Sequence, residues 1–243
     1  MREVVYRKKL ANFVLDDLSL KNLLDFLALD FSNRKVAIGI HITTLNSVFK
    51  REIDIEEFSK IDYVYADGWS ILSLGRLSGL RNAERIATTD LFPLLLSPIG
   101  KPLRVEFIGG EPDIGSQVIS NWNLYRPQDY CNFYHGYQEN WSKILKQVRA
   151  NKPDIVFLGL GMPLELKFIN AYFDLLPHCL ILTCGGMLRI LAGKERRSPK
   201  LVQQLRLEWL FRLITTPRRT FSRYSIGFWN WFKACIIILR DRV

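Results

Sequence analysis

Short apolar runs alternate with segments of helical spacing up to about residue 193. Uninterrupted apolar runs of this kind are typical of strands covered on both faces. Residues 19–30, 139–153 and 163–176 instead repeat apolar positions at helical spacing. This alternation predicts an α/β fold, with a mainly parallel sheet and helices on both faces. The predicted strands are 35–42, 61–66, 103–110, 131–137, 154–161 and 179–186.

Glycines follow several of these strands. Gly109-Gly110, Gly159 with Gly161, and Gly185-Gly186 each close an apolar run. In open α/β sheets, ligands bind beyond the carboxyl ends of the strands. We therefore expect the functional site at that edge of the sheet.

The pattern changes after residue 193, where no strand is predicted. We divide the chain into an α/β catalytic domain, 1–193, and a helical appendage, 194–243. Between residues 194 and 223, nine basic residues face two acidic ones, so this piece holds +7 of the chain's net charge of +10. Because the appendage is also rich in Trp and Phe, an amphipathic helix on an anionic membrane is favoured over a nucleic-acid partner.

The overall composition adds limits to this picture. The chain has 243 residues, of which 48% are hydrophobic, as expected of a globular protein. Its four cysteines form no CxxC pair, and its three histidines have no metal-ligand spacing, so reduced thiols and no metal site are expected. The N-terminus lacks the apolar region of a signal peptide, and the apolar stretch 226–239 is shorter than a membrane span.

Asp67 raises the main chemical question, because it interrupts the apolar stretch VYADGWSILSL, 64–74. It directly follows a predicted strand, and Gly68 permits a sharp turn there. A partly desolvated carboxylate at that position has a raised pKa and suits general-base work. The alternative is a cap on the helix that follows. Local pattern alone favours the cap or turn.

Other polar groups also follow strands. Thr43, Thr44 and Asn46 suit either a sugar or phosphate contact at a helix N-terminus or simple capping. Arg85 suits either a bidentate phosphate contact or an ion pair, and Asp90 suits a helix cap. The turn GLGMP, 159–163, resembles a phosphate cradle, but the chain has no Walker A, GxSxG, GxGxxG or DxD motif.

The motifs in this order resemble those of the WecG/TagA/CpsF glycosyltransferases, glycosyltransferase family 26. The resemblance covers about residues 35–224. It rests on TLN (44–46), ADG (66–68), ERIATTDL (84–91), FIGG (107–110), HGY (135–137), DIVFLGLGMP (154–163), GG (185–186) and GKERRSP, LEWLFRL, PRR and RY within 193–224.

The resemblance implies a Rossmann-like α/β domain whose basic appendage helps to reach the membrane and to close the site. It implies an inverting, metal-independent transfer of a sugar from a UDP-sugar to a polyprenyl-diphosphate-linked sugar, in the synthesis of bacterial surface polysaccharide. The implied place is the cytoplasmic face of the inner membrane, with peripheral attachment to an anionic surface. No cofactor and no nucleic acid are expected, and homo-oligomer formation stays open.

Carried over by motif, Asp67 would be the general base that deprotonates the acceptor hydroxyl. Thr44 and Asn46 would contact a sugar beside it, and Arg85 would bind phosphate or a sugar substituent. The appendage arginines would bind a diphosphate. The full set of expected substrate-binding residues is Thr44, Asn46, Arg85, Thr89, Asp90, Gly110, Gly161, Glu165, Gly186, Arg212, Arg219 and Arg223.

One position departs from the family pattern. Members usually carry glutamine and then glutamate after the proline of the GLGMP turn, where this chain has Glu165 and Leu166. Ionised glutamate cannot donate a hydrogen bond as glutamine does, which indicates a different donor sugar. ManNAc, ManNAc-uronate, glucose and glucuronate all stay open as donor sugars.

The sequence leaves two rival classes of function. One is a non-catalytic basic module that binds membrane or nucleic acid, and tight, salt-sensitive nucleic-acid binding without sugar transfer would favour it. The other is an oxidoreductase with a nucleotide cofactor, against which the absence of GxGxxG counts.

Overall fold

A six-stranded parallel sheet forms the centre of the computed structural model, which describes residues 5–28, 33–205 and 207–241. The side chains of Gln204, Arg218 and Arg219 lie outside what it describes. The strand order is β4-β3-β8-β7-β5-β6. All six predicted strands are confirmed, as β3 Lys35–Ile40, β4 Tyr63–Ala66, β5 Arg104–Gly109, β6 Tyr130–Tyr134, β7 Ile155–Gly159 and β8 Leu180–Thr183.

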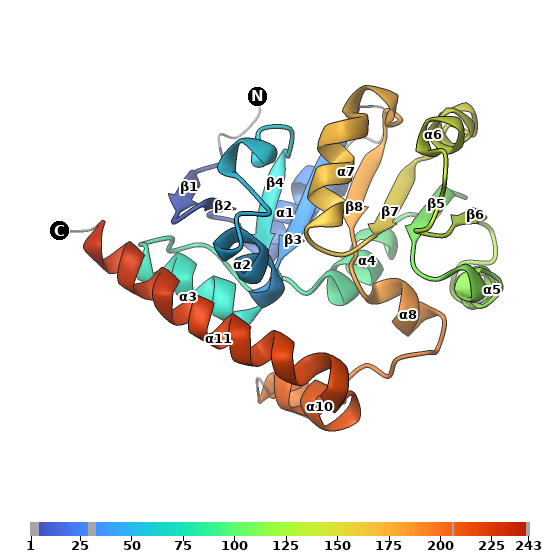
Figure 1. The fold of residues 1–243 in the computed structure, drawn as a ribbon. Helices are drawn as coiled ribbons and strands as arrows, with labels where there is room; N and C mark the ends of the chain where they lie inside the picture. The colour runs from blue at the N-terminus through green and yellow to red at the C-terminus, as the bar shows by residue number, and fades with distance from the viewer. Residues whose placement is uncertain (1–4, 29–32, 206, 242–243) are drawn as a thin grey trace.

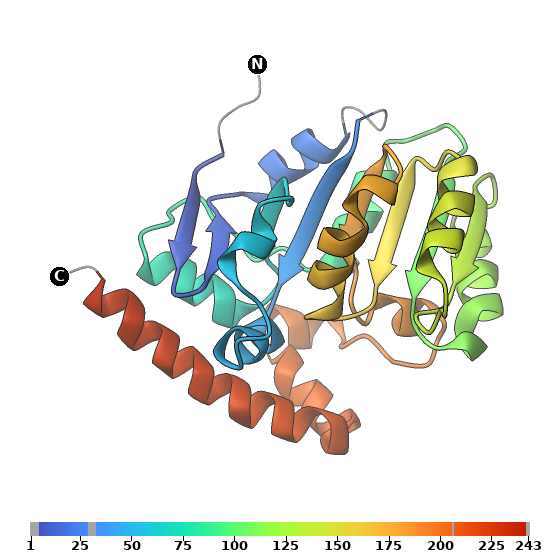
Figure 2. The same cartoon turned by 45° about the horizontal axis from the view of Figure 1, so that its top comes forward.

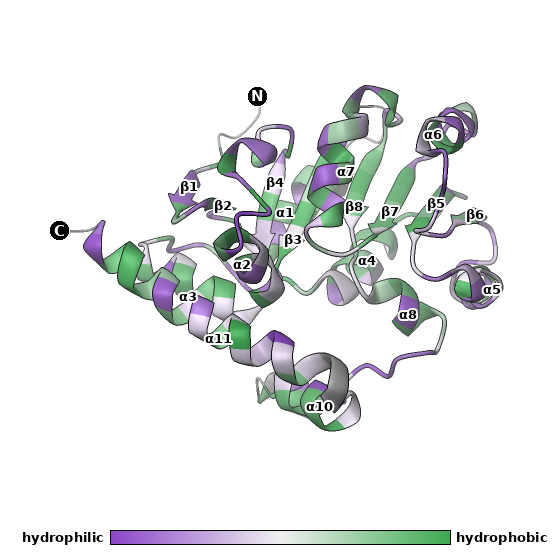
Figure 3. Ribbon diagram, viewed as in Figure 1, coloured by the Kyte–Doolittle hydropathy of each residue, from purple (hydrophilic) through white to green (hydrophobic). Residues whose placement is uncertain are grey.

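Helices cover both faces of this sheet (Figure 1). The central strands are fully buried because apolar side chains from both of their faces enter two separate cores. Val156 and Leu158 of β7 belong to one core, and Ile155 and Phe157 belong to the other. Figure 3 shows β3, β7 and β8 as the continuous hydrophobic centre of the molecule. The predicted α/β class is therefore confirmed.

The helices of the α/β part fall into two layers. One core includes side chains from α2, α3, α6 and α7, and the other includes side chains from α1, α4, α5 and α8. The three predicted helices are confirmed as α1, α6 and α7, except that positions 29–30 lie outside the described residues. The bounds are α1 Leu20–Ala28, α2 Ile42–Phe49, α3 Trp69–Leu77, α4 Thr88–Leu96, α5 Gly115–Tyr125, α6 Trp141–Ala150, α7 Leu164–Tyr172 and α8 Met187–Leu191. Single 3₁₀ turns occur at Ile55–Phe58, Pro112–Ile114 and Phe173–Leu175.

An antiparallel hairpin precedes the sheet and was not predicted. Its strands are β1, Arg7–Leu10, and β2, Phe13–Asp16. The sequence RKKL has no strand pattern, and tertiary contacts hold it instead. The guanidinium of Arg7 pairs with the buried carboxylate of Asp16, with Nε and Oδ1 2.6 Å apart. Asp16 also accepts a hydrogen bond from the Val64 N–H, which ties the hairpin to β4.

Three helices form the C-terminal part: α9, Lys200–Gln204, α10, Glu208–Thr215, and α11, Pro217–Arg240. Consistent with the prediction, no strand follows residue 193 among the described residues. Figure 2 shows α11 and α10 lying beyond the ends to which the strand arrows point. The carboxyl edge of the sheet, where a ligand is expected, therefore faces these helices.

Helix α11 packs against α2 and α3. A Cβ atom added at Gly227 would lie 2.7 Å from Cγ1 of Ile42, so glycine permits the close approach of α11 to α2. Further along α11, Ala234 and Ile238 are buried in the same core as α2 and α3. The division at residue 193 stays a prediction, but removing everything after it would expose this core. No helix among the described residues is long and apolar enough to cross a membrane.

Candidate active site

Asp67 lies at the carboxyl end of β4, as predicted, and it does not cap the helix that follows. Gly68 is the N-cap residue of α3, and no side chain caps that helix. The alternative that Asp67 caps α3 is therefore wrong. The segment 85–88 instead runs beside the end of β4, where the Ile86 N–H donates to the Ala66 carbonyl over 2.8 Å. This bridge places Arg85 and Thr88 next to Asp67.

A chain of two buried hydroxyl groups ends at the Asp67 carboxylate. The hydroxyl oxygens of Tyr65 and Thr88 are 2.7 Å apart, and the Thr88 hydroxyl donates to Oδ2 of Asp67 over 3.5 Å. The backbone N–H of Thr88, the first residue of α4, also donates to Asp67. Gly39 makes room for the chain, because a Cβ atom there would lie 2.8 Å from the Tyr65 ring. These contacts orient one carboxylate oxygen toward the protein.

The surroundings of Asp67 shift its titration. Burial raises the pKa of Asp67 to about 7, although the charges of Arg85 and Arg212 lower it. The charge of Glu208 raises this pKa further, and the hydrogen bond from Thr88 lowers it. A carboxyl group with a pKa near 7 takes up and releases a proton near neutral pH, as a general base must.

Three charged side chains from the two regions of the molecule meet beside Asp67. Nη2 of Arg85 lies 2.7 Å from Oε2 of Glu208, and Nη2 of Arg212 lies 3.2 Å from Oε1 of the same carboxylate. The guanidinium of Arg85 also lies over the Trp69 ring, 5.9 Å from its centroid. The structure therefore brings Arg85 and Arg212, two of the expected substrate-binding residues, to one carboxylate beside Asp67.

The start of α2 forms another side of the site. His41 caps this helix: its Nδ1 accepts hydrogen bonds from the N–H and hydroxyl of Thr43, and the Thr44 hydroxyl accepts one from the His41 N–H. Burial, with the charges of Arg223 and Arg212, lowers the pKa of His41 to about 4. His41 is therefore neutral at pH 7. Thr44 is fully buried and fills the capping role that was one of its two predicted roles.

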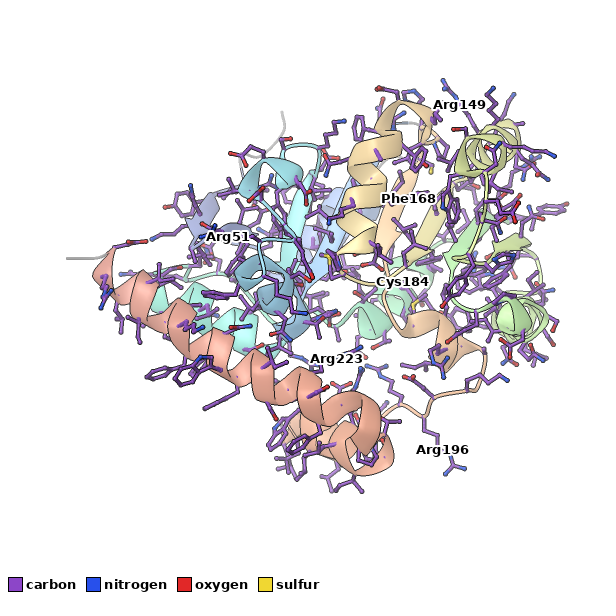
Figure 4. All side chains as sticks on the ribbon, in the orientation of Figure 1. Arg51, Arg149, Phe168, Cys184, Arg196 and Arg223 are labelled. Atoms are coloured by element: carbon purple, nitrogen blue, oxygen red, sulfur yellow. The ribbon has the colours of Figure 1, made fainter. Side chains whose placement is uncertain are left out.

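Asn46 links α2 to the C-terminal helix. Its side-chain amide donates to the Arg223 carbonyl over 3.1 Å, and its oxygen accepts from the Asn230 amide over 3.0 Å. Figure 4 shows Arg223 on the side of α11 toward the α/β part, whereas Arg196 points away from it. The charge of Arg223 acts on His41, so Arg223 lies with Asn46 at this edge of the sheet.

Glu165 lies at the start of α7, close enough to Asp67 for the two charges to interact. Its side chain is buried, and its Oε1 accepts a hydrogen bond from the Gly185 N–H over 3.0 Å. Burial raises its pKa to about 7 against the backbone hydrogen bonds that lower it, and the nearby charge of Asp67 adds to the rise. Added Cβ atoms at Gly161 and Gly186 would meet nothing within 4 Å. Both glycines therefore border open space near this carboxyl group.

Four expected residues are placed less directly. Asp90 forms an ion pair with Arg197, whose guanidinium also donates to the Thr89 carbonyl over 3.4 Å, so both residues hold the segment that leads to α9. Gly110 directly follows β5 with a φ of +70°, and a Cβ atom added there would lie 2.6 Å from Cδ1 of Ile114. Arg219 lies on α11, and its side chain is outside the described part of the structure.

Sequence reasoning missed several members of this site. Tyr65 and Thr88 belong to quoted motifs, but only the fold brings their hydroxyls to Asp67. His41 lies inside the predicted strand 35–42, whereas β3 ends at Ile40 and His41 caps α2, so the local pattern gave no signal for it. Glu208 was counted only as an opposing charge in a basic segment. The described residues contain no group of three or more His, Cys, Asp or Glu side chains that could hold a metal ion.

Comparison with known proteins gives a single family. The model described as "Glycosyl transferase WecG/TagA/CpsF family" matches residues 8–242. A protein of Bacillus subtilis (strain 168), named N-acetylglucosaminyldiphosphoundecaprenol N-acetyl-beta-D-mannosaminyltransferase, is 29% identical over 215 residues, 86% of this chain and 83% of its own length. A protein of the same name from Bacillus spizizenii is 30% identical over 170 residues, 69% of this chain and 66% of its own length.

Proposed function

The chain belongs to the glycosyl transferase WecG/TagA/CpsF family, and from this premise we propose that it transfers a sugar from a UDP-sugar to a polyprenyl-diphosphate-linked sugar. The names of its relatives support an N-acetylglucosaminyl-diphosphate lipid as the acceptor and N-acetylmannosamine as the first donor sugar to test. The product would enter a bacterial surface polysaccharide.

The observation that carries the proposal is the environment of Asp67. Its carboxyl group has a pKa raised by burial to about 7, and the charges of Arg85 and Arg212 both act on it. In an inverting transfer, one carboxylate takes the proton of the acceptor hydroxyl while that oxygen attacks the anomeric carbon. The donor's diphosphate leaves from the opposite face with added negative charge. Guanidinium groups stabilise such charge by paired hydrogen bonds.

The transfer step balances with the donor, the acceptor and Asp67 alone. A bond forms between the acceptor oxygen and the anomeric carbon, and the bond from that carbon to the donor's phosphate oxygen breaks. The acceptor's proton moves to Asp67, and the electron pair of the broken bond leaves with UDP. We propose that Arg85, Arg212 and Arg223 receive that charge, so that no metal ion is required for it.

The acceptor's lipid tail places the reaction at a membrane, and the appendage supports this part of the proposal. Large apolar side chains on α10 and α11 are exposed although α11 buries its opposite side. Aromatic and apolar side chains beside arginines favour the interface of an anionic membrane. We propose peripheral attachment at the cytoplasmic face of the inner membrane through Trp209, Phe221, Phe228, Trp229 and Phe232.

The activity is tested with purified protein, a polyprenyl-diphosphate N-acetylglucosamine acceptor and a panel of UDP-sugars, with products identified by mass spectrometry. We expect transfer from at least one donor, and a loss of more than about 100-fold in kcat for Asp67→Asn, the size usual for a general base. Asp113→Asn, at an exposed ion pair with Lys194, is the matched control. Wild-type turnover by Asp67→Asn would refute the mechanism, and no transfer from any donor would refute the activity.

Membrane attachment is tested by flotation with vesicles of phosphatidylglycerol and phosphatidylcholine. We expect binding that grows with the anionic lipid fraction and falls at least about tenfold in the Trp229→Ser/Phe232→Ser variant. Tyr137→Ser changes a more exposed aromatic residue outside the appendage and should leave binding unchanged. Equal flotation of all three proteins would exclude α11 as the attachment site.

A further inference from the structure

We propose that Glu208 is a positioning residue for the transfer reaction: its carboxylate joins Arg85 of the α/β part to Arg212 of α10, so that both guanidiniums face one diphosphate beside Asp67. The inference rests on the proposed function and adds to it a residue that is neither base nor substrate ligand. It explains why an acidic side chain stands among basic ones in the appendage.

The geometry makes Glu208 a bridge. It is the first residue of α10, and each of its two oxygens contacts a different arginine. One arginine precedes α4, and the other lies one turn further along α10. The side chains of Arg85 and Glu208 are only 16% and 20% exposed, so solvent screens their interaction less than it screens a surface pair. The bridge therefore fixes α10 at the carboxyl edge of the sheet.

Electrostatics gives the reason for an acidic residue here. Two guanidiniums held close together repel each other, and a carboxylate between them removes that cost. Nε of Arg85 is buried without a hydrogen-bond partner, so this guanidinium retains an unused donor. An oxyanion of a diphosphate supplies the acceptor that this donor lacks. Glu208 thus holds the arginines in place without using all their donors.

Glu208 also belongs to the set of charges that act on the base. The groups facing Asp67 are Arg85 before α4, Arg212 and Glu208 on α10, Glu165 on α7, and Tyr65 and Thr88 through their hydroxyls. Arg85 and Arg212 favour the ionised base, whereas Glu208 opposes them. Removing the Glu208 charge should therefore lower the pKa of Asp67 and weaken it as a base.

The test compares Glu208→Gln, Glu208→Asp and a control, Glu195→Gln. Glu195 is a matched control because it pairs with Arg189 over 2.8 Å and is 25% exposed, close to the values for Glu208. We expect Glu208→Gln to lose about tenfold or more in kcat/KM and to shift the acidic limb of its pH profile to lower pH. Glu208→Asp keeps the charge, so its limb should stay near that of the wild type. Lower activity with an unmoved limb in Glu208→Gln would indicate mere structural support and overturn the proposal.

Hydrogen exchange without substrate separates this inference from the proposed function. Amides of α10 should exchange faster in Glu208→Gln, and also in Arg85→Met, which leaves the sequence of α10 intact. Unchanged exchange in Arg85→Met would overturn the bridge. If the wild type transfers no sugar, the proposed function fails, and faster exchange in Arg85→Met still supports the bridge between the two regions.

Discussion

On the α/β side of Asp67, Thr88 is 4% exposed and Tyr65 is 1% exposed, whereas on the appendage side the Arg212 side chain is 45% exposed. The first side orients the Asp67 carboxylate through hydrogen bonds between buried groups, which form as part of the core. The second side supplies positive charge through an ion pair within reach of solvent. Salt and single substitutions should therefore affect the two sides differently.

The same contrast appears along α11. Its later part buries Ala234 and Ile238 in the core, and the Trp231 indole donates to the Ser70 carbonyl over 3.0 Å. The earlier part, nearer the site, contacts the α/β region through polar groups such as Asn46 and Arg223. One end of the helix is thus anchored by apolar packing, while the other end holds Arg223 next to Asn46 at the proposed substrate site.

Of the variants that separate the two sides of Asp67, we expect the largest effect from removing a buried hydrogen bond on the α/β side. Thr88→Val keeps the shape but removes the hydroxyl between Tyr65 and Asp67. We expect kcat to fall about 10- to 100-fold, as small misplacements of a catalytic group cause, and the free energy of unfolding to fall by about 1–3 kcal/mol because the Tyr65 hydroxyl loses its partner.

Two further variants make this test specific. Thr88→Ser keeps the hydroxyl and should keep most of the activity. Thr88→Val/Tyr65→Phe removes both partners and should recover stability but not kcat. Recovery of kcat in the double variant would show that Thr88 supports only the fold.

A smaller effect should come from separating α11 from α2. In Gly227→Leu, the new side chain meets Ile42, where even a Cβ atom would lie 2.7 Å away. We expect a loss of about 1–3 kcal/mol in unfolding free energy, the usual cost of overpacking, and a rise in KM for the UDP-sugar. Ile226→Leu, at the exposed neighbouring position, should leave both quantities unchanged. An unchanged KM in Gly227→Leu would mean that the α11 contact does not position donor-binding groups.

The pH dependence of kcat/KM should report on the buried carboxyl groups of the α/β side. Burial raises the pKa of Asp67 and of Glu165 to about 7, so the pair titrates in the neutral range. Because the base must be ionised, kcat/KM should rise with pH up to about 7 and fall at most about tenfold per unit below it. In Glu165→Gln the neighbouring charge is gone, so this limb should move to lower pH. If the acidic limb of the wild-type kcat/KM profile lay near pH 4, the base would not be a carboxyl group whose pKa is raised by burial.

The smallest effect should come from salt. Raising ionic strength from about 0.05 to 0.5 M screens exposed charges, so we expect KM for the UDP-sugar to rise a few fold while kcat stays nearly constant. Arg212→Gln should reduce this salt effect, whereas Arg196→Gln, which changes an arginine that points away from the site, should leave it intact (Figure 4). An equal salt effect in both variants would show that Arg212 does not contribute to binding the UDP-sugar.

Particular residues show where sequence reasoning succeeded and where it stopped. The six strands of the sheet were predictable because runs such as 154–161 are apolar on both faces. The β1–β2 hairpin was not predictable, because the sequence of β1 is charged. Its strand is held by the ion pair between Arg7 and Asp16, which exists only in the folded protein. Asp67 was correctly placed at a strand end, but only the structure showed that it does not cap α3 and that segment 85–88 runs beside it.

The sequence by itself determined the α/β alternation, the strand ends that carry polar groups and the basic, aromatic character of the appendage, because these follow from local periodicity and composition. Only the tertiary structure decided that Tyr65 and Thr88 support Asp67, that the charges of Glu165 and Asp67 interact, and that Glu208 joins Arg85 to Arg212. Arg85 and Glu208 are 123 positions apart in the chain, so no local pattern could predict their contact. The packing of α11 on α2 and α3 holds the two regions together at the site.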